Sequence, residues 1–190
     1  MRLRRRILAR LQKPAVVLES HAGHGRVYER AWFKASTGVA IELDAVKAEH
    51  LARQRPTWRV YQGDCEKAIA AGLAAETPFD IIDLDPYGEP FTMMDAIAVP
   101  GRVFPDVWHL VVNDGTRNHC RRGGAWTMKA LATAVRRHGP NLFPIYLQVA
   151  KELTQEFAAK IGFTMTGWAG YHTGTGGDMT HYWAVLERRK

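Results

Sequence analysis

Short apolar runs alternate with longer mixed stretches along the first part of the chain. The runs predict buried strands, because the strands of a parallel sheet covered on both faces read as nearly continuous hydrophobic segments. Such runs lie at residues 15–19, 38–42, 58–61, 79–84 and 107–112. The stretches between them predict helices at residues 26–33, 45–53, 66–75 and 91–99. This alternation predicts a mostly parallel sheet with helices on both faces.

The end of the chain breaks the alternation. Two further helices are predicted at residues 126–138 and 144–161, and two further strands at 163–171 and 180–186. The glycine-rich segment 174–178 between these strands indicates an antiparallel hairpin. Segment 115–125 is polar and rich in glycine and arginine, which predicts a loop. We therefore expect an α/β fold with a mostly parallel seven-stranded sheet and a C-terminal antiparallel hairpin.

A basic segment precedes the first strand. Residues 2–12 predict a short helix with apolar side chains on one face and arginines around it, and Pro14 ends it. We expect this basic N-terminal segment, residues 1–13, to be followed by a single domain over residues 14–190. Six of the first thirteen residues are Arg or Lys, and the whole chain has a net charge of +7. Clustered positive charge favours a polyanionic partner, so nucleic acid is the expected partner.

Composition narrows the classes of protein further. The hydrophobic fraction of 46% and the charged fraction of 24% are typical of a soluble globular domain. No apolar stretch approaches the roughly 20 residues of a membrane span, and the N-terminus lacks the apolar run of a secretory signal. Cys65 and Cys120 lie far apart and form no CxxC pair, which favours a reducing compartment and argues against zinc. We expect a cytoplasmic protein without a metal site or membrane contact.

The first predicted strand ends at an acid and a glycine turn. Glu19 closes the strand and is followed by His21, Ala22, Gly23 and Gly25. Glycines let the backbone approach a ligand closely, and an acid at a strand end can bind an amino group or a hydroxyl. A glycine turn alone is weak support for a cofactor, because any tight strand-to-helix turn needs one.

Acids also end the second and third predicted strands. Glu42 lies where a carboxylate can bind both hydroxyls of a ribose. Asp64, followed by Cys65, could accept a hydrogen bond from an adenine amino group, but it also fits the N-cap of the next helix. Asp44 fits such a cap after Glu42, so capping explains Glu42 less well. The order of these acids along the chain favours S-adenosylmethionine as the cofactor.

The fourth predicted strand carries the most informative residues. Asp83 and Asp85 end an apolar run and are followed by Pro86, Tyr87 and Gly88. Burying an unpaired carboxylate is costly, and proline stops the strand from continuing. Open α/β sheets bind ligands at this edge, where the step displays a carboxylate, a backbone carbonyl and an aromatic ring. Aromatic-proline steps also occur as inert turns, but a turn does not explain two acids on an apolar strand.

These residues resemble a known family. Asp85-Pro86-Tyr87-Gly88 resembles the Asp/Asn-Pro-Pro-Tyr/Phe motif of methyltransferases that act on exocyclic amines. Residues 81–97 are similar to the Asp-x-Asp-Pro-Phe-Gly-Ser-Pro segment and following helix of the tRNA guanine-N2 dimethyltransferases. Tyr87 and Glu89 stand where that family has Phe and Ser, and no counterpart of its C-terminal RNA-handling domain is expected. Residues 19–25 resemble the S-adenosylmethionine loop of nucleic-acid methyltransferases, with His21 in place of the usual Phe.

The resemblance implies a Rossmann-like class I methyltransferase that methylates an exocyclic amine of a nucleobase, with guanine N2 in tRNA-like RNA preferred. It implies that Asp85 accepts an amine hydrogen, that the Pro86 carbonyl holds the second, and that Tyr87 stacks on the base. The implied cofactor residues are Glu19, His21, Ala22, Gly23, Gly25, Glu42, Asp64, Cys65 and Asp83. Arg117, Arg121 and Arg122 are candidates for phosphate contact. A DNA base amine, a protein or small-molecule amine, and an inactive binding subunit remain as alternatives.

Overall fold

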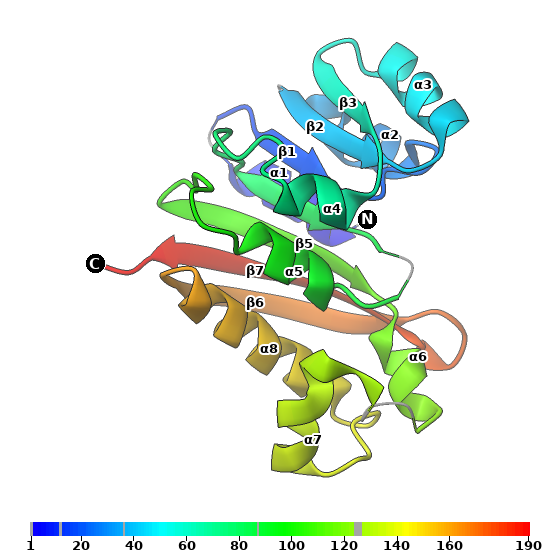
Figure 1. Ribbon diagram of the computed structural model, residues 1–190, viewed down its shortest axis with the longest axis vertical. Coiled ribbons are helices and arrows are strands. Elements are labelled where there is room, and N and C mark those ends of the chain that lie inside the picture. The colour runs from blue at the N-terminus through cyan, green and yellow to red at the C-terminus, as the bar shows by residue number, and fades with distance from the viewer. Residues whose placement is uncertain (1, 12, 36, 87, 124–126) are drawn as a thin grey trace.

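The computed structural model describes residues 2–11, 13–35, 37–86, 88–123 and 127–190 of the chain (Figure 1). Its strands are β1 (Val16–Glu19), β2 (Thr37–Glu42), β3 (Trp58–Gln62), β4 (Ile81–Leu84), β5 (Val107–Asp114), β6 (Phe163–Thr173) and β7 (Met179–Arg188). Its α-helices are α1 (Arg2–Arg10), α2 (Arg26–Arg30), α3 (Ala45–Gln54), α4 (Cys65–Ala70), α5 (Phe91–Ile97), α6 (Thr116–Arg121), α7 (Ala132–His138) and α8 (Tyr146–Lys160). Short 3-10 turns include η1 (Trp32–Lys34), η3 (Lys129–Leu131) and η4 (Thr175–Gly177).

The strands form one sheet in the order β3-β2-β1-β4-β5-β7-β6. The pairs among β1 to β5 are parallel, whereas β7 runs antiparallel to both β5 and β6. The long hairpin of β6 and β7 is prominent in Figure 1. The predicted fold class, a seven-stranded, mostly parallel sheet that ends in an antiparallel hairpin, is therefore confirmed.

Two hydrophobic clusters cover the two faces of the sheet, because successive strand side chains point to opposite faces. Val17 and Ile81 belong to the cluster that also contains Ile7 of α1 and Trp32. Leu18 and Ile82 belong to the other cluster, which α5 and α8 help to form. In Figure 1, α4, α5 and α8 lie in front of the sheet and α1 lies behind it. Each face is buried beneath its own helices, as the continuous apolar strands predict.

Several local boundaries differ from the predictions; the helix predicted at 126–138, for example, begins as α7 at Ala132. Residues 116–121, predicted within a loop, form α6, whose first turn begins where the Thr116 N–H donates to Asp114 Oδ1 at 2.8 Å. The helix is short and polar, so its sequence lacks the apolar period that predicts longer helices. The helix predicted at 66–75 ends at Ala70, and Arg102 Nη2 donates to the Ile69 carbonyl in its last turn and to the Leu73 carbonyl beyond it. A neighbouring carboxylate thus marks the start of α6, whereas a distant arginine contacts the end of α4.

Among the described residues, no helix combines the length and the apolar character needed to cross a membrane.

Candidate functional site

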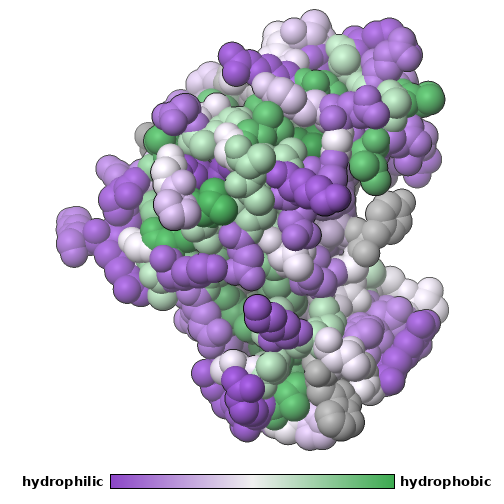
Figure 2. All heavy atoms as spheres, in the orientation of Figure 1, coloured by the Kyte–Doolittle hydropathy of each residue, from purple (hydrophilic) through white to green (hydrophobic). Residues whose placement is uncertain are grey.

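The carboxyl ends of β1, β2, β3 and β4 meet at one edge of the sheet, because parallel strands share their direction. Backbone bonds join the segments there: the Ser20 N–H donates to Asp83 O and the Ala22 N–H to Ile41 O, both at 3.0 Å. The His21 N–H donates to Cys65 Sγ at 3.3 Å. The predicted cofactor residues of four separate segments are therefore neighbours in space. Figure 2 shows the surface indented on the right, between the part that carries α2 and α3 and the part that carries α6.

The glycine turn after β1 is held in shape by Glu42. Glu42 Oε2 accepts from the Gly23 N–H at 2.7 Å, and its Oε1 accepts from the Asp44 N–H at 3.0 Å. Gly25 has φ +78°, and a Cβ there would lie 2.7 Å from Gln54 Oε1 and 3.0 Å from Leu51 Cδ2. Only glycine fits this position, because both the backbone and the space exclude a side chain. The turn therefore places backbone without side chains next to the Glu42 carboxylate.

Asp44 and Asp64 both cap helices. Asp44 Oδ1 accepts from the Lys47 N–H and Asp64 Oδ1 from the Lys67 N–H, each at 3.0 Å. The predicted cap of Asp44 is confirmed, and the alternative explanation of Asp64 as a cap is also confirmed. Asp64 lies at the exposed end of α4, next to buried Cys65.

Glu19 points into the fold. Its Oε2 accepts from Arg55 Nη1 at 2.6 Å, and both side chains are buried. The Arg55 guanidinium also lies 4.4 Å from the ring centroid of Tyr28 and 5.1 Å from that of Trp58. Burial raises the pKa of the Glu19 carboxyl, and Arg55 opposes that rise. Its contact with a cofactor stays a prediction, and its observed partner is Arg55.

Asp83 is fully buried and binds partners from before and after β1. Arg4 of α1 donates from Nε to Oδ2 and from Nη2 to Oδ1, both at 2.6 Å. Trp32 Nε1 donates to Oδ2 at 2.7 Å. The sequence indicated that this carboxylate needs a partner, but it did not identify Arg4. The one available signal was the helical spacing that places Arg4 on the same face as Ile7.

Asp85 lies at the surface edge of this network, with its side chain 25% exposed. Asn113, at the end of β5, donates from Nδ2 to Asp85 Oδ1. Arg4 Nη2 lies 3.9 Å from Asp85 Oδ2. Burial raises the pKa of the Asp85 carboxyl above its ordinary value, while Arg4 and the Asn113 hydrogen bond oppose the rise. The arrangement holds a partly exposed carboxylate in a fixed position, ready to accept a proton.

The segment that follows Asp85 is hydrogen-bonded to the residue directly after β5. The Pro86 carbonyl accepts from the Gly88 N–H at 3.0 Å, and the Gly88 carbonyl accepts from the Gly115 N–H at 2.8 Å. Gly88 has φ +134°, a conformation that favours glycine. Tyr87, predicted to stack on a base, lies outside the described residues. The Pro86 oxygen retains a second lone pair beyond the bond to Gly88.

Two further side chains extend the site along the sheet. Asn113 pairs with His181 of β7, and His181 pairs with Tyr171 of β6, so the three share one face. The rings of Tyr171 and His181 have centroids 5.5 Å apart. Burial lowers the pKa of His181 to about 4, so its ring is neutral at pH 7. Sequence reasoning missed this row because antiparallel register across the hairpin creates it.

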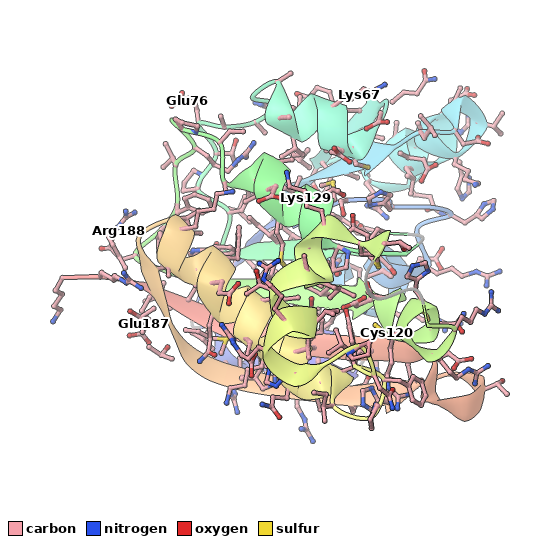
Figure 3. The ribbon with its side chains drawn as sticks, turned by 60° about the horizontal axis from the view of Figure 1, so that its bottom comes forward. Lys67, Glu76, Cys120, Lys129, Glu187 and Arg188 are labelled. Atoms are coloured by element: carbon pink, nitrogen blue, oxygen red, sulfur yellow. The ribbon has the colours of Figure 1, made fainter. Side chains whose placement is uncertain are left out.

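The predicted phosphate contact of the 115–125 segment was wrong for Arg117. Its side chain is buried, its Nη1 donates to the Gly177 carbonyl, and its guanidinium lies 3.6 Å from the Phe143 ring centroid. Arg121 forms an ion pair with Asp178 at 3.0 Å. Figure 3 shows Cys120 of the same helix at the other end of the molecule from Arg188. These contacts fasten α6 to the hairpin, and of the three arginines only Arg122 has no partner recorded among the described residues.

The described residues contain no group of three or more His, Cys, Asp or Glu side chains placed to hold a metal ion.

The fold described above also occurs in solved structures of other proteins. No family model and no curated protein matches the chain. Trm1 from Pyrococcus horikoshii, in complex with S-adenosyl-L-methionine, matches with TM-score 0.66 and 15% identity over 96% of this chain and 53% of its own. TYW2 from M. jannaschii, in complex with AdoMet, matches with TM-score 0.61 and 13% identity over 99% and 75%. The N-methyltransferase NodS from Bradyrhizobium japonicum, with S-adenosyl-L-homocysteine, matches with TM-score 0.59 and 14% identity over 100% and 87%.

The chain therefore has the Rossmann-like α/β fold of class I methyltransferases. It spans about half the length of the Trm1 chain that it matches. Because one fold supports many reactions, the activity has to be argued from the site.

Proposed function

We propose that the protein transfers a methyl group from S-adenosylmethionine to an exocyclic amine of a nucleobase, with guanine N2 in RNA as the first candidate. The observation that carries this proposal is Asp85, held by Asn113 and Arg4 beside the glycine turn that Glu42 fixes. Three solved structures of the same fold contain this cofactor or its demethylated product. The similarity of the three structures supports S-adenosylmethionine as the cofactor. The position of the Asp85 carboxylate supports an amine as the group that receives the methyl.

The residues at the strand ends fit this cofactor. Gly23 has positive φ and open space where a side chain would lie, so a ligand can approach the turn there, whereas Gly25 packs against α3. Glu42 would hold the ribose hydroxyls, and Asp64 would face the adenine amino group. His21, Ala22 and Cys65 would form the walls between these acids, with Glu19 and Asp83 supporting them from inside the fold. When bound, S-adenosylmethionine supplies an electrophilic methyl group.

The residues of the chain would act on the amine. Its lone pair is delocalised into the ring, so it is a poor nucleophile, and orientation is the main contribution of the protein. Asp85 would accept one amine hydrogen and take the proton as the nitrogen gains the methyl group. The Pro86 carbonyl would accept the other hydrogen, and Tyr87 would stack on the base. Asn113 would keep Asp85 oriented through the bond to Oδ1.

The basic charge of the chain supports nucleic acid as the substrate, with RNA preferred over DNA by resemblance to the tRNA enzymes. The protein would be incubated with methyl-labelled S-adenosylmethionine and, separately, with tRNA, ribosomal RNA, DNA and protein. We expect label in RNA, and nucleoside digestion to place it on guanine N2. Label in DNA or protein and none in RNA would exclude the RNA substrate. Calorimetry with S-adenosylhomocysteine would show whether an inactive binding subunit keeps the cofactor site.

Asn113→Ala tests the positioning of Asp85. The Asn113 hydrogen bond lowers the pKa of Asp85, so its removal raises that pKa further. Activity needs the deprotonated carboxylate, so it is lost as the pH falls through the pKa. The acid limb of the kcat/KM profile is therefore expected to move to higher pH in the variant. The exposed Asn141→Ala is the control, and an acid limb that does not move in Asn113→Ala would refute the positioning role.

A further inference from the structure

Helix α1 presents three different faces. Arg4 and Ile7 are buried and face the sheet. Leu3, Arg6 and Arg10 share a second face, and Arg5, Leu8 and Ala9 a third, as helical spacing requires. Arg5, Arg6 and Arg10 are exposed on the two outer faces. Of the four arginines in α1 whose side chains the structure describes, one points inward and three point outward.

A surface hollow lies on each side of α1. The first, of about 520 Å³, is lined by Arg6 and Arg10 together with Trp168 and Trp183 of the hairpin. The second, of about 530 Å³, is lined by Arg5 and Arg30 with Phe33 and Lys34 of η1. Both hollows combine basic side chains with aromatic rings. Phe33 is 51% exposed and Lys34 Nζ lies 5.5 Å from its ring centroid, so the opposite face of the ring can stack with a planar group.

Arg5, Arg6, Arg10, Arg30 and Lys34 form what we call the α1 basic surface. Within the described part of the chain, none of the five forms an ion pair with a carboxylate. By contrast, Arg121, Arg137 and Arg188 pair with acids. Arg5 Nε donates to the Arg30 carbonyl at 2.8 Å and the Arg10 guanidinium lies 5.1 Å from the Trp183 ring centroid, so these contacts orient the two side chains without neutralising their charge.

Helix α1 starts at the candidate site, whereas the two hollows beside it reach toward the opposite edge of the sheet, where Ala15 precedes β1 and Glu187 pairs with Val107 at the start of β5. Arg4 binds Asp83 and lies 3.9 Å from Asp85, just after β4, while Lys13 pairs with Asp80, just before β4, at 2.9 Å. Helix α1 therefore runs back along β4, away from Asp85. Its nine residues span roughly 13 Å, so Arg5 and Arg6 follow Arg4 in sequence on the outer faces of the helix, and Arg10 lies furthest from Asp85.

We infer that the α1 basic surface binds single-stranded RNA and leads it to Asp85. This inference rests on the proposed function and adds the place where the strand lies. The arginines would contact phosphates, and Phe33 would stack on a base, which is the combination that single-strand binding surfaces use. An acidic protein would use the arginines but would not require the exposed aromatic ring. The bond from Arg4 to Asp83 fixes this surface relative to the catalytic carboxylate.

The test measures binding, independently of methyl transfer. Fluorescence anisotropy would follow a labelled single-stranded RNA of about 20 nucleotides, long enough for such sites. The same sequence as an RNA duplex, the DNA strand and polyglutamate would be the comparison ligands. The variant is Arg5→Gln/Arg6→Gln/Arg10→Gln. Its matched control, Arg59→Gln/Arg136→Gln/Lys151→Gln, removes the same charge from other exposed positions.

We expect the α1 triple variant to lose at least about tenfold in affinity for the RNA strand. The slope of log K against log salt should fall by about 2, because each phosphate contact on a single strand contributes about 0.7. The control triple variant should stay within about twofold, since its arginines and lysine lie away from the surface, and both variants should bind S-adenosylhomocysteine as the wild type does. Phe33→Ala should weaken binding of the RNA strand by about five- to a hundredfold and leave duplex binding nearly unchanged.

Equal losses in the two triple variants would overturn the inference, because they would show a general charge effect. Tighter binding of duplex or of polyglutamate than of the RNA strand would also overturn it. Methyl transfer is scored separately on the wild type. RNA binding at α1 without methyl transfer to RNA would refute the proposed function alone, whereas methyl transfer that is unchanged in the α1 triple variant would refute the docking surface alone.

Discussion

Asp85→Asn is expected to lower kcat for methyl transfer by about 10²- to 10⁴-fold, the usual contribution of a positioned general base. The substitution keeps the size of the side chain but removes the charge that would take the amine proton. Cofactor affinity should change little, because Asp85 is not part of the glycine turn that Glu42 stabilises and that would bind the cofactor. Single-turnover rates with labelled S-adenosylmethionine and calorimetry with S-adenosylhomocysteine would separate the two effects.

Asp95→Asn provides the matched control, since Asp95 lies on α5 with its side chain 75% exposed. It should retain wild-type kcat. Wild-type activity should also fall with decreasing pH at a pH above the ordinary aspartate range, because burial raises the pKa of Asp85 and the protonated acid cannot accept the amine proton. Near-full activity of Asp85→Asn at every pH would show that another group, or none, receives the proton.

Arg4→Ala is expected to reduce the free energy of unfolding by about 3–5 kcal/mol, the typical cost of removing one partner of a buried ion pair. Asp83 has no exposed surface, so its charge would remain in the interior with only Trp32 Nε1 as a recorded hydrogen-bond donor. Denaturant unfolding followed by tryptophan fluorescence would measure the loss.

Arg6→Ala, two residues further along the same helix and exposed, should change stability by less than about 0.5 kcal/mol. The double variant Arg4→Met/Asp83→Leu should recover part of the stability, because replacing a buried pair by apolar groups of similar size is often neutral, while Trp32 Nε1 loses its acceptor. If Arg4→Ala were as stable as Arg6→Ala, the ion pair would contribute little to holding α1. If the double variant stayed as unstable as Arg4→Ala, loss of packing would explain the effect better than an unpaired charge.

The fold class and the positions of the strands could be predicted from the sequence because they depend on local patterns. Each buried strand is a short apolar run, and proline or glycine marks most of its boundaries. The hairpin follows from the glycine-rich segment between β6 and β7, residues 174–178. Helix α6 could not be predicted in the same way, because the side-chain carboxylate of Asp114 and contacts with the hairpin stabilise its short polar sequence.

The site was predictable only in part. The acids at the strand ends could be placed at one edge, because parallel strands bring their carboxyl ends together. Their partners could not be predicted, since Arg4, Asn113 and Arg55 come from elements far away in the sequence. Arg117 is a second example. Its polar, glycine-rich surroundings in the sequence predicted an exposed side chain, but contacts across the fold place that side chain against Phe143. Periodicity predicts which face of an element is buried, whereas ion pairs depend on the assembled fold.

The tie between Arg4 and Asp83 also sets an order of events during synthesis. The two residues are 79 positions apart, so α1 leaves the ribosome long before the strand that anchors it. Its inward arginine has no buried carboxylate to bind until β4 has joined β1, and contacts of such long range form slowly. Helix α1 is therefore made well before β4 but settles only after it, so the sheet edge that carries Asp83 is completed by a segment synthesised much earlier.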